Sequence, residues 1–443
     1  MKRRHFCQIA PATVAGIGRG AAAGKQVREP AREVPVVEEA DVIVCGGGPA
    51  GSAAAIAAAR AGARTRLIES QGSIGGVWTT GLMTEFSDTR NKQGIVQEIL
   101  DNLRRRGGLS GGHYGTFDPE IMKRVLDGMC SEAGVAVRLH TLVAGAIKNS
   151  DGRLTHVITE SKSGREAWAA KCFVDATGDG DLAARAGCGF DFGHPETGEF
   201  QPFSLRCVVA GIADTGGPVF TDHSNQPTAA WKEFARGGVE ASYLKANFFP
   251  IRPGVAGLMA NHQYGSRPMD AEAVTKATLE ARDELHRIVE ALRSLGGNWK
   301  DIWLAATGEM IGMREGRRIH GLYTVTVKDA TSGARFDDAV CRATYSIDIH
   351  SGNPKRTKGI VRHGLKARPF DIPLRCLIAK DAGALLMAGR CISGDHYAHG
   401  SYRISGNASA TGEAAGRTAA IAARSNRLPH QVQFKELGLE LPA

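Results

Sequence analysis

Blocks of apolar and small residues after position 40 predict an alternation of strands and helices. Residues 41–45 form a short apolar run rich in β-branched side chains, and residues 66–68 form a second run. Between them, residues 52–61 are nearly all small and end at Gly62, as in a helix that packs closely on a sheet. Residues 41–68 therefore predict a strand, a helix and a second strand.

Two more helices are predicted next. Residues 94–103 have apolar positions at helical spacing. Asp118 and Pro119 supply an N-cap and a first-turn proline, and Gly134 supplies the ending signal of the following helix. Its predicted buried face consists of Ile121, Val125, Leu126 and Met129.

Strand patterns follow this helix. Residues 135–139 are one predicted strand, and residues 142–174 are a predicted antiparallel meander with turn signals at 151–152 and 163–164. The meander ends in the apolar strand 171–175. Residues 384–390 later repeat the pattern of a strand leading into a glycine.

The segment 190–370 lacks this clean periodicity and is the part where we expect substrate specificity. It contains one strong helix pattern, which begins after Asp270 and ends at Gly296 and Gly297. The apolar positions of that helix recur at three and four residues, which favours core packing: Val274, Ala277, Ala281, Leu285, Ile288, Leu292 and Leu295.

The glycine-rich turn after the first strand suggests a nucleotide site. Gly46 can make the turn off the strand, Gly48 can let the backbone approach a pyrophosphate, and Gly51 can let the helix lie close on the sheet. The helix N-terminus then faces the phosphates. Glu69 follows Gly51 by 18 residues, where an acid accepts hydrogen bonds from a ribose. The alternative is an ordinary glycine turn.

Two later motifs indicate which nucleotide is bound. The strand 171–175 runs into the letters ATGDGD, and residues 384–388 run into GRCIS. With these motifs the sequence resembles the FAD-dependent oxidoreductases of the glutathione-reductase type, in particular the branch with DATGDGDLA and AGRCIS-DH-AHGS-R motifs. The resemblance spans about residues 40–423. It implies an α/β fold in which an inserted α+β substrate domain interrupts a Rossmann-like FAD-binding domain.

The resemblance also implies a set of FAD contacts and a division of the chain. Val143 is expected to contact the adenine through its backbone. The full set of expected FAD contacts is Gly46, Gly48, Pro49, Ala50, Gly51, Glu69, Ser70, Gly75, Gly76, Val77, Val143, Thr177, Gly178, Gly389, Arg390, Ser405 and Gly406. The expected division is a leader at 1–24, a linker at 25–39, the FAD-binding domain at 40–190 and 371–425, a substrate region at 191–370 and a tail at 426–443.

Catalytic candidates cluster between the last strand of the FAD-binding domain and the helix 404–423. A flavin dehydrogenase must remove a proton as the hydride leaves, and histidine has a suitable pKa for that role. His396 and His399 are the candidate bases, with Tyr402 and Arg403 orienting the substrate or stabilising an oxyanion. The alternatives are histidines with a structural role, or a metal site for which the sequence supplies no full ligand set. Cys391 is a candidate for covalent flavin attachment, although a lone cysteine at a strand end is typically inert.

Further charged residues have two interpretations. Arg314 and Arg317, within the stretch GMREGRRI, can hold a substrate carboxylate or stabilise reduced flavin. Alternatively, Arg314, Glu315 and Arg318 form structural ion pairs, which the spacing favours. Asp179 and Asp181 suggest solvent-facing or capping residues more than a metal pair.

Composition narrows the possible partners. The chain is 42% apolar and 23% charged, as in ordinary globular proteins, and no run approaches the roughly twenty apolar residues of a membrane helix. Its nine cysteines include no CxxC pair, which favours buried reduced thiols. No basic stripe or aromatic platform for nucleic acid is visible.

The N-terminus resembles an export signal. Residues 2–6 contain twin arginines, residues 9–17 are weakly apolar, and residues 21–23 are small. These features predict a twin-arginine leader and periplasmic or other export. The alternative is a disordered basic tail on a cytoplasmic enzyme. Removing the leader would lower the net charge from +9 to +5.

The predicted function is an FAD-dependent oxidoreductase. It would be a dehydrogenase or oxidase that takes a hydride from a small hydroxylated or amino-bearing substrate. Because no second strand–GxGxxG–helix unit is visible, electrons are expected to come from that substrate and to leave to oxygen, a quinone or a carrier protein. The alternative is a flavin-holding binding protein or a redox-neutral isomerase in which FAD is structural.

Overall fold

The computed structural model describes residues 27–110, 115–221, 226–265 and 267–440. The chain divides into two units, residues 1–34 and residues 35–443, and the elements below all belong to the second. The predicted leader at 1–24 lies outside the described residues, as does Cys7.

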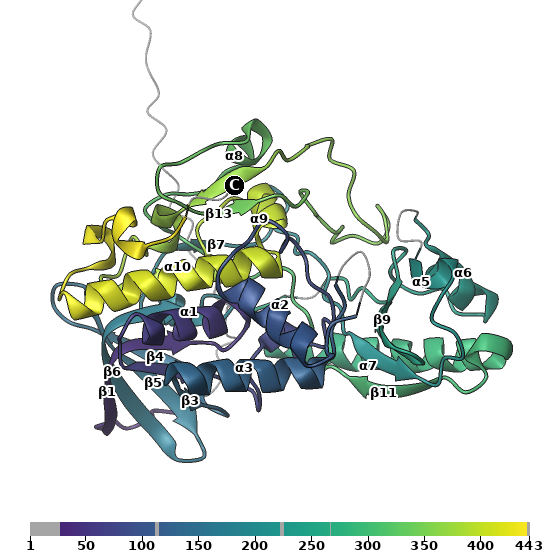
Figure 1. Cartoon of the computed structure of the whole chain (residues 1–443), viewed down its shortest axis with the longest axis horizontal. Coiled ribbons are helices and arrows are strands. Elements are labelled where there is room, and N and C mark those ends of the chain that lie inside the picture. The colour runs from purple at the N-terminus through teal and green to yellow at the C-terminus, as the bar shows by residue number, and fades with distance from the viewer. Residues whose placement is uncertain (1–26, 111–114, 222–225, 266, 441–443) are drawn as a thin grey trace, which may run out of the picture. The chain divides into compact units, whose positions relative to one another are not determined.

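A seven-stranded sheet organises the first lobe of this unit (Figure 1). Its strands are β1 (Val36–Cys45), β2 (Thr65–Ile68), β3 (Ala136–Arg138), β4 (Leu142–Lys148), β5 (Leu154–Ser161), β6 (Gly164–Asp175) and β15 (Leu385–Met387). The order is β3-β2-β1-β6-β5-β4, and β15 also pairs with β6. The pairs β3–β2, β2–β1, β1–β6 and β6–β15 are parallel, whereas β4, β5 and β6 form the predicted antiparallel meander.

Two small-residue helices pack side by side on this sheet, α1 (Pro49–Arg60) and α10 (Ser405–Arg424). A Cβ added at Gly412 would lie 2.0 Å from the carbonyl oxygen of Ala50, and one at Gly416 would lie 2.1 Å from that of Ala54. Glycine is therefore required at both positions for the helices to approach. Because the contacts advance in the same direction along both helices, α1 and α10 are parallel and their N-termini lie at the same end.

The neighbouring helices are α2 (Ile95–Arg105) and α3 (Pro119–Ala133). Asp118 caps α3 by accepting from two backbone N–H groups, and Gly134 ends it in a left-handed conformation, both as predicted. One position of its predicted buried face was wrong: Met122 is fully buried, and Ile121 is only half-buried.

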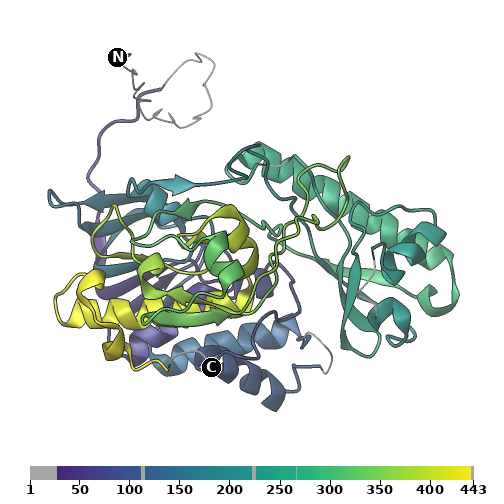
Figure 2. The same cartoon turned by 90° about the horizontal axis from the view of Figure 1, so that it is seen from above.

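A second lobe lies beside the first (Figure 2). It has an antiparallel sheet of order β11-β8-β10-β9. Its elements are β8 (Cys207–Ala210), α5 (Pro218–Thr221), α6 (Ala229–Arg236), β9 (Asn247–Arg252), β10 (Val255–Met259), α7 (Ala271–Ser294) and β11 (Trp303–Thr307). Asp270 caps α7 as predicted, and the helix packs into a hydrophobic core separate from that of the first lobe. The structure confirms the predicted α/β fold with an inserted α+β lobe.

Short elements connect the two lobes. β7 (Phe190–Asp191) pairs antiparallel with β12 (Arg318–Ile319), where the chain leaves and re-enters the first lobe. The remaining helices and strands are α4 (Asp181–Arg185), α8 (Val327–Ser332), β13 (Ala339–Ala343), β14 (Phe370–Pro373) and α9 (His396–Tyr402). Side chains between residues 319 and 377 pack into the first core, so the predicted substrate region 191–370 contributes to both cores.

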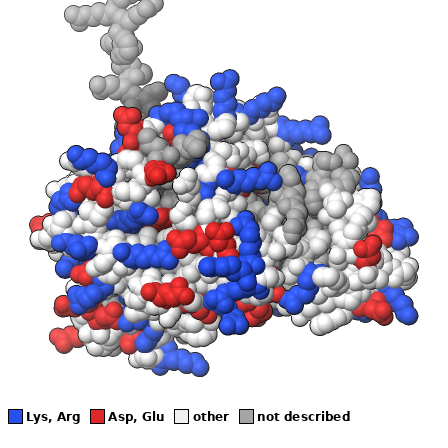
Figure 3. All heavy atoms as spheres, viewed as in Figure 1, with Lys and Arg blue, Asp and Glu red and all other residues white. Residues whose placement is uncertain are grey.

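The described part of the chain has mixed surface charge on the face shown and no disulfide bonds. Acidic and basic side chains are interspersed on the face seen in Figure 3. All eight described cysteines are free and buried, and burial raises the pKa of Cys391 well above its ordinary value. No described helix is long and apolar enough to cross a bilayer. Among the described residues, no group of three or more His, Cys, Asp or Glu side chains could hold a metal ion.

Candidate active site

One continuous cavity connects the glycine turn of the first lobe with the inner wall of the second. Its first end is lined by Gly48, Glu69 and Val143, and its other end by Arg206 and Arg314. The cavity therefore begins at the carboxyl ends of the parallel strands, where open α/β sheets bind their ligands.

The glycine turn leaves α1 with free N–H groups at the cavity. The N-cap is Gly48, which has no side-chain capping bond, and a Cβ added there would meet nothing within 4 Å. Gly46 has φ +93°, which a residue with a side chain rarely adopts. A Cβ at Gly51 would lie 1.7 Å from the carbonyl oxygen of Gly46, so only glycine allows this close helix–turn contact.

Glu69 closes the turn at the tip of β2. Its Oε2 accepts from the backbone N–H of Gly47 at 2.6 Å, and its Oε1 accepts from that of Gln71 at 2.7 Å. The carboxylate is buried and lines the cavity. Oε1 also accepts from the Ser70 hydroxyl at 3.1 Å, whereas Oε2 keeps a second lone pair that can accept a hydrogen bond from a ligand.

The structure places all but three of the expected FAD contacts in the cavity lining. The exceptions are Gly51, Gly75 and Gly406. Gly75 has φ +109° and donates its N–H to the carbonyl of Gly47. This hydrogen bond stabilises the glycine turn without placing Gly75 in the cavity lining. Gly406 packs against the backbone at Asp88. These three glycines position the wall without being part of it.

The N-terminus of α10 faces the same cavity. Its N-cap, Ile404, provides no side-chain capping bond, and both Ile404 and Ser405 line the cavity. The Ser405 Oγ is buried without a hydrogen-bond partner, as is the Nη1 of Arg390. The N–H of Gly406 donates to the carbonyl of Ser87, so the groups available to a polar ligand are the other first-turn N–H groups of α10, the Ser405 hydroxyl and the Arg390 guanidinium.

The ATGDGD corner is held by three carboxylates, of which Asp175 is fully buried and Asp179 and Asp181 are partly buried. Asp175 accepts from Thr177 and from the backbone of Ala183. Asp179 pairs with Arg390 at 3.1 Å, and Asp181 pairs with Arg317 at 2.9 Å. Asp179 is not solvent-facing, because its side chain is only 14% exposed beside Arg390, whereas Asp181 lies in the first turn of α4 with 35% of its side chain exposed.

The four catalytic candidates separate in the structure. Arg403 lines the cavity, whereas His396, His399 and Tyr402 do not. Their segment forms the short helix α9, in which Asp395 is the N-cap. The sequence predicts that all four side chains take part in catalysis. The helix instead turns His396, His399 and Tyr402 toward the core.

Each of these three side chains is held within the protein. His396 Nδ1 lies 3.3 Å from Glu315 Oε2, and the Tyr402 hydroxyl donates to the carbonyl of Ile392 at 3.1 Å. His399 is fully buried, and its two ring nitrogens have no partner. Burial, with the nearby charge of Arg318, lowers the pKa of His399 well below its ordinary value. No observation tests their predicted catalytic roles, but their positions do not favour them.

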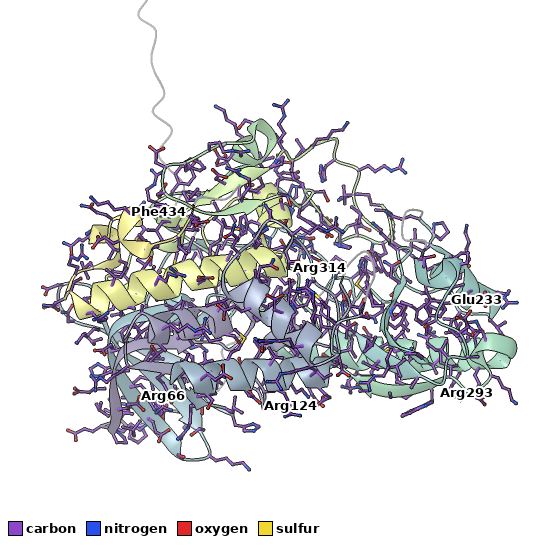
Figure 4. The ribbon with its side chains drawn as sticks, viewed as in Figure 1. Arg66, Arg124, Glu233, Arg293, Arg314 and Phe434 are labelled. Atoms are coloured by element: carbon purple, nitrogen blue, oxygen red, sulfur yellow. The ribbon has the colours of Figure 1, made fainter. Side chains whose placement is uncertain are left out.

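Within the GMREGRRI stretch, Arg317 and Arg318 have structural roles, whereas Arg314 is placed where it could contact a ligand. Arg317 pairs with Asp181, and Arg318 donates to the carbonyls of Gly394 and Gly193. These two arginines fix the segment in place. Arg314 instead lines the cavity, near the N-terminal end of α10 (Figure 4).

Several side chains that support the Arg314 end of the cavity were not predicted from the sequence. Asp348 bonds Arg403 at 3.0 Å and His350 at 3.1 Å. His350 packs edge-on to His262, which stacks on Tyr243 at 3.9 Å between ring centroids. Burial and the Arg314 charge lower the pKa of His350 to about 4, so its ring is neutral at pH 7. No local motif marks these residues, because they come from separate segments without helix or strand periodicity.

Comparison with known proteins gives one match that spans nearly the whole chain. A family model described as FAD dependent oxidoreductase matches residues 41–441. No curated protein matches the chain.

Solved structures of similar fold are distant. A geranylgeranyl bacteriochlorophyll reductase-like protein from Thermoplasma acidophilum is 14% identical, aligned over 88% of this chain and 80% of that protein, with a TM-score of 0.44. The flavin-dependent brominase Bmp2 is 13% identical over 90% and 82%, with a TM-score of 0.47. The myxobacterial chondrochloren halogenase CndH is 13% identical over 90% and 78%, with a TM-score of 0.46. Similarities this distant carry no information about the reaction.

Proposed function

The chain belongs to the family of FAD-dependent oxidoreductases, and on that basis we propose that it oxidises a small organic substrate carrying a hydroxyl or amino group. It is an enzyme, and its cofactor is FAD. The observation that carries the proposal is the continuous cavity, which joins a dinucleotide-type turn in one lobe to charged and apolar side chains of the other.

The residues at the first end of the cavity fit FAD. The uncapped N-terminus of α1 offers N–H groups for the pyrophosphate, with open space at Gly48 for close approach. Glu69 retains acceptor capacity for a ribose. The uncapped α10 N-terminus, with the free Ser405 hydroxyl, suits the part of the flavin where negative charge accumulates on reduction. This arrangement supports placing the chain in the glutathione-reductase-type branch.

FAD, when bound, supplies the acceptor for the two electrons that leave the substrate as a hydride. In the proposed reaction, a substrate C–H bond and an O–H or N–H bond break while a C=O or C=N bond forms. The hydroxyl or amino proton leaves to a base or to water. The two electrons would leave to oxygen, a quinone or a carrier protein, which completes the balance of the reaction.

The second lobe forms the wall of the proposed substrate site. Ser204, Arg206, Met259 and Met310 line the cavity beyond the glycine turn. Thioether side chains adapt to an apolar substrate body, and the polar groups fix its orientation. Arg403 reaches the same space from the first lobe, and Asp348 fixes its guanidinium there.

The test uses the purified yellow holoenzyme. Small hydroxy and amino compounds are added anaerobically while the flavin band near its visible maximum is followed. We expect at least one compound class to bleach the band, and admitting oxygen or adding a quinone should restore it. If FAD stays bound and no compound bleaches it, while dithionite does, the flavin-holding or isomerase alternative replaces this proposal.

A further inference from the structure

Three guanidinium groups gather at the substrate end of the cavity, and they are not equally neutralised. Arg206, Arg314 and Arg403 all line it. Glu85 binds Arg206 through both carboxylate oxygens, at 2.7 and 2.6 Å. Asp348 binds Arg403 at 3.0 Å. Each of these two arginines therefore has a carboxylate partner.

Arg314 has no carboxylate partner among the described residues. Its Nη1 donates to the carbonyl of Pro202 at 2.6 Å and to the hydroxyl of Ser204 at 3.0 Å, and both acceptors are uncharged. Only 9% of the residue is exposed. A buried charge without a counterion is costly, so positions of this kind are occupied by a ligand of opposite charge when the protein works.

The surroundings supply only a shared negative charge: Asp348 also acts on Arg314, but it is hydrogen-bonded to Arg403 and His350. His350, Tyr243 and His262 lie behind the arginines, and the pKa of each tyrosine or histidine shifts toward the neutral form because of burial. Burial together with the neighbouring Arg403 and Arg206 lowers the pKa of Arg314 to about 10, so it remains a cation at pH 7. Three arginines and two carboxylates leave one positive charge.

Arg403 adds a second donor to the same space. Its Nη2 bonds Asp348, but its Nε is buried and has no hydrogen-bond partner. A planar anion such as a carboxylate can accept from two guanidinium groups at once, because each of its oxygens has free lone pairs. Met259 and Met310 provide an apolar wall nearby.

We propose that the substrate is a carboxylate, a hydroxy acid or amino acid with an apolar body, whose anionic group binds Arg314 with help from Arg403. This inference rests on the proposed function, because it names the substrate class of the same site. A second source of the same negative charge is the reduced flavin itself, and the experiment below separates the two.

The experiment titrates the oxidised holoenzyme with acetate and benzoate and, in parallel, with acetamide and benzamide, which match them in shape but carry no charge. Binding is followed through the visible spectrum of the bound flavin, without turnover. We expect saturable changes with the acids and changes at least about tenfold weaker with the amides. Equal responses, or no response to either acid, would overturn the inference.

Variants locate the binding charge. In Arg314→Gln we expect the acids to bind at least about 30-fold more weakly, which corresponds to about 2 kcal/mol, because truncating one member of a buried charge pair weakens binding strongly. Arg314→Lys keeps the charge but loses the planar fork, and should lie between the two. Arg293→Gln is the matched control: its guanidinium also donates to a carbonyl, that of Ile302, but it is exposed on α7, away from Arg314 in Figure 4.

Three other outcomes of these experiments have distinct meanings. If Arg314 serves the reduced flavin alone, Arg314→Gln lowers the flavin reduction potential while acid binding stays at the wild-type level, and the inference falls. If Arg314→Gln does not fold, Arg314→Lys decides: wild-type acid binding in that variant contradicts the predicted two-pronged contact. Failure of the proposed function has a different signature, namely acid binding with no bleaching by any hydroxy or amino acid.

Discussion

The two ends of the cavity offer different groups to a ligand. At the glycine turn the backbone provides the contacts, through the free N–H groups of α1 beyond Gly48 and the close approach of Gly51 to Gly46. At the other end side chains provide them, through Arg206, Arg314 and Arg403. In the proposed sites, cofactor binding therefore depends on space that must stay empty, whereas substrate recognition depends on charges that must be present.

The largest expected effect is at the backbone end. Gly51→Val would place a Cβ in collision with the Gly46 carbonyl oxygen, which lies 1.7 Å from that position. We expect purified protein without bound FAD, measured as the ratio of flavin to protein absorbance. Gly128→Ala is the control, because an added Cβ there meets nothing within 4 Å on helix α3. Retention of FAD by Gly51→Val would show that the turn is not the binding element.

The side-chain end should fail differently. Arg403→Met removes a cavity-lining charge and leaves Asp348 with one fewer partner. We expect FAD to stay bound while the rate of anaerobic reduction by substrate falls about 30-fold or more. The separation of the two ends would be contradicted if this variant lost its flavin as Gly51→Val should.

Acid should act on the substrate end through its buried histidine. Burial lowers the pKa of His350 from 6.5 to about 4, so the unfolded chain binds a proton that the folded chain rejects. The folded state therefore has its full stability above about pH 6.5, and we expect it to lose on the order of 1 kcal/mol per pH unit as the pH falls toward 4. Melting temperatures from pH 8 to pH 4 measure this.

His350→Gln provides the comparison for that pH series. It should melt lower at pH 7, because it loses a packed ring beside His262, but its melting temperature should fall less steeply with acid. Equal slopes in both proteins would assign the acid response to other groups.

The smallest effect is expected at His399, which lies outside the cavity lining. For His399→Gln we expect the substrate reduction rate to change by less than about tenfold with FAD still bound. A loss of several hundredfold in a folded, yellow variant would restore His399 as the base, and would require the α9 helix to move during turnover.

Sequence reasoning succeeded where one short segment specifies its own geometry. The turn from Gly46 to Gly51, the cap at Asp270 and the ending glycine at Gly134 each combine signals within a few residues. The parallel pairing of β1 with β2 fits the same local unit, because α1 supplies the crossover connection that parallel strands need.

The side-chain pairs of the candidate site could not be predicted from the sequence, because they join segments that lie far apart along the chain. Glu85 and Arg206 are paired across 121 residues, and Asp348 and Arg403 across 55. The DH-AHGS-R motif drew attention to His399 because of its residue types, but helical rotation within α9 decides which side chains face the cavity. Arg314 could be named from sequence as one of two candidates, and only its position separated it from Arg317.

The contact between α1 and α10 has a consequence for how the protein is made. Because Gly412 and Gly416 lie against the backbone at Ala50 and Ala54, two segments far apart in the sequence must meet before α1, which follows the nucleotide turn, has its neighbouring helix. A nascent chain that has not yet been extended through residue 424 lacks that complete helix, so we expect flavin loading to require synthesis of α10. A C-terminal nonsense mutation within α10 should then yield an apoprotein, however intact its glycine motif.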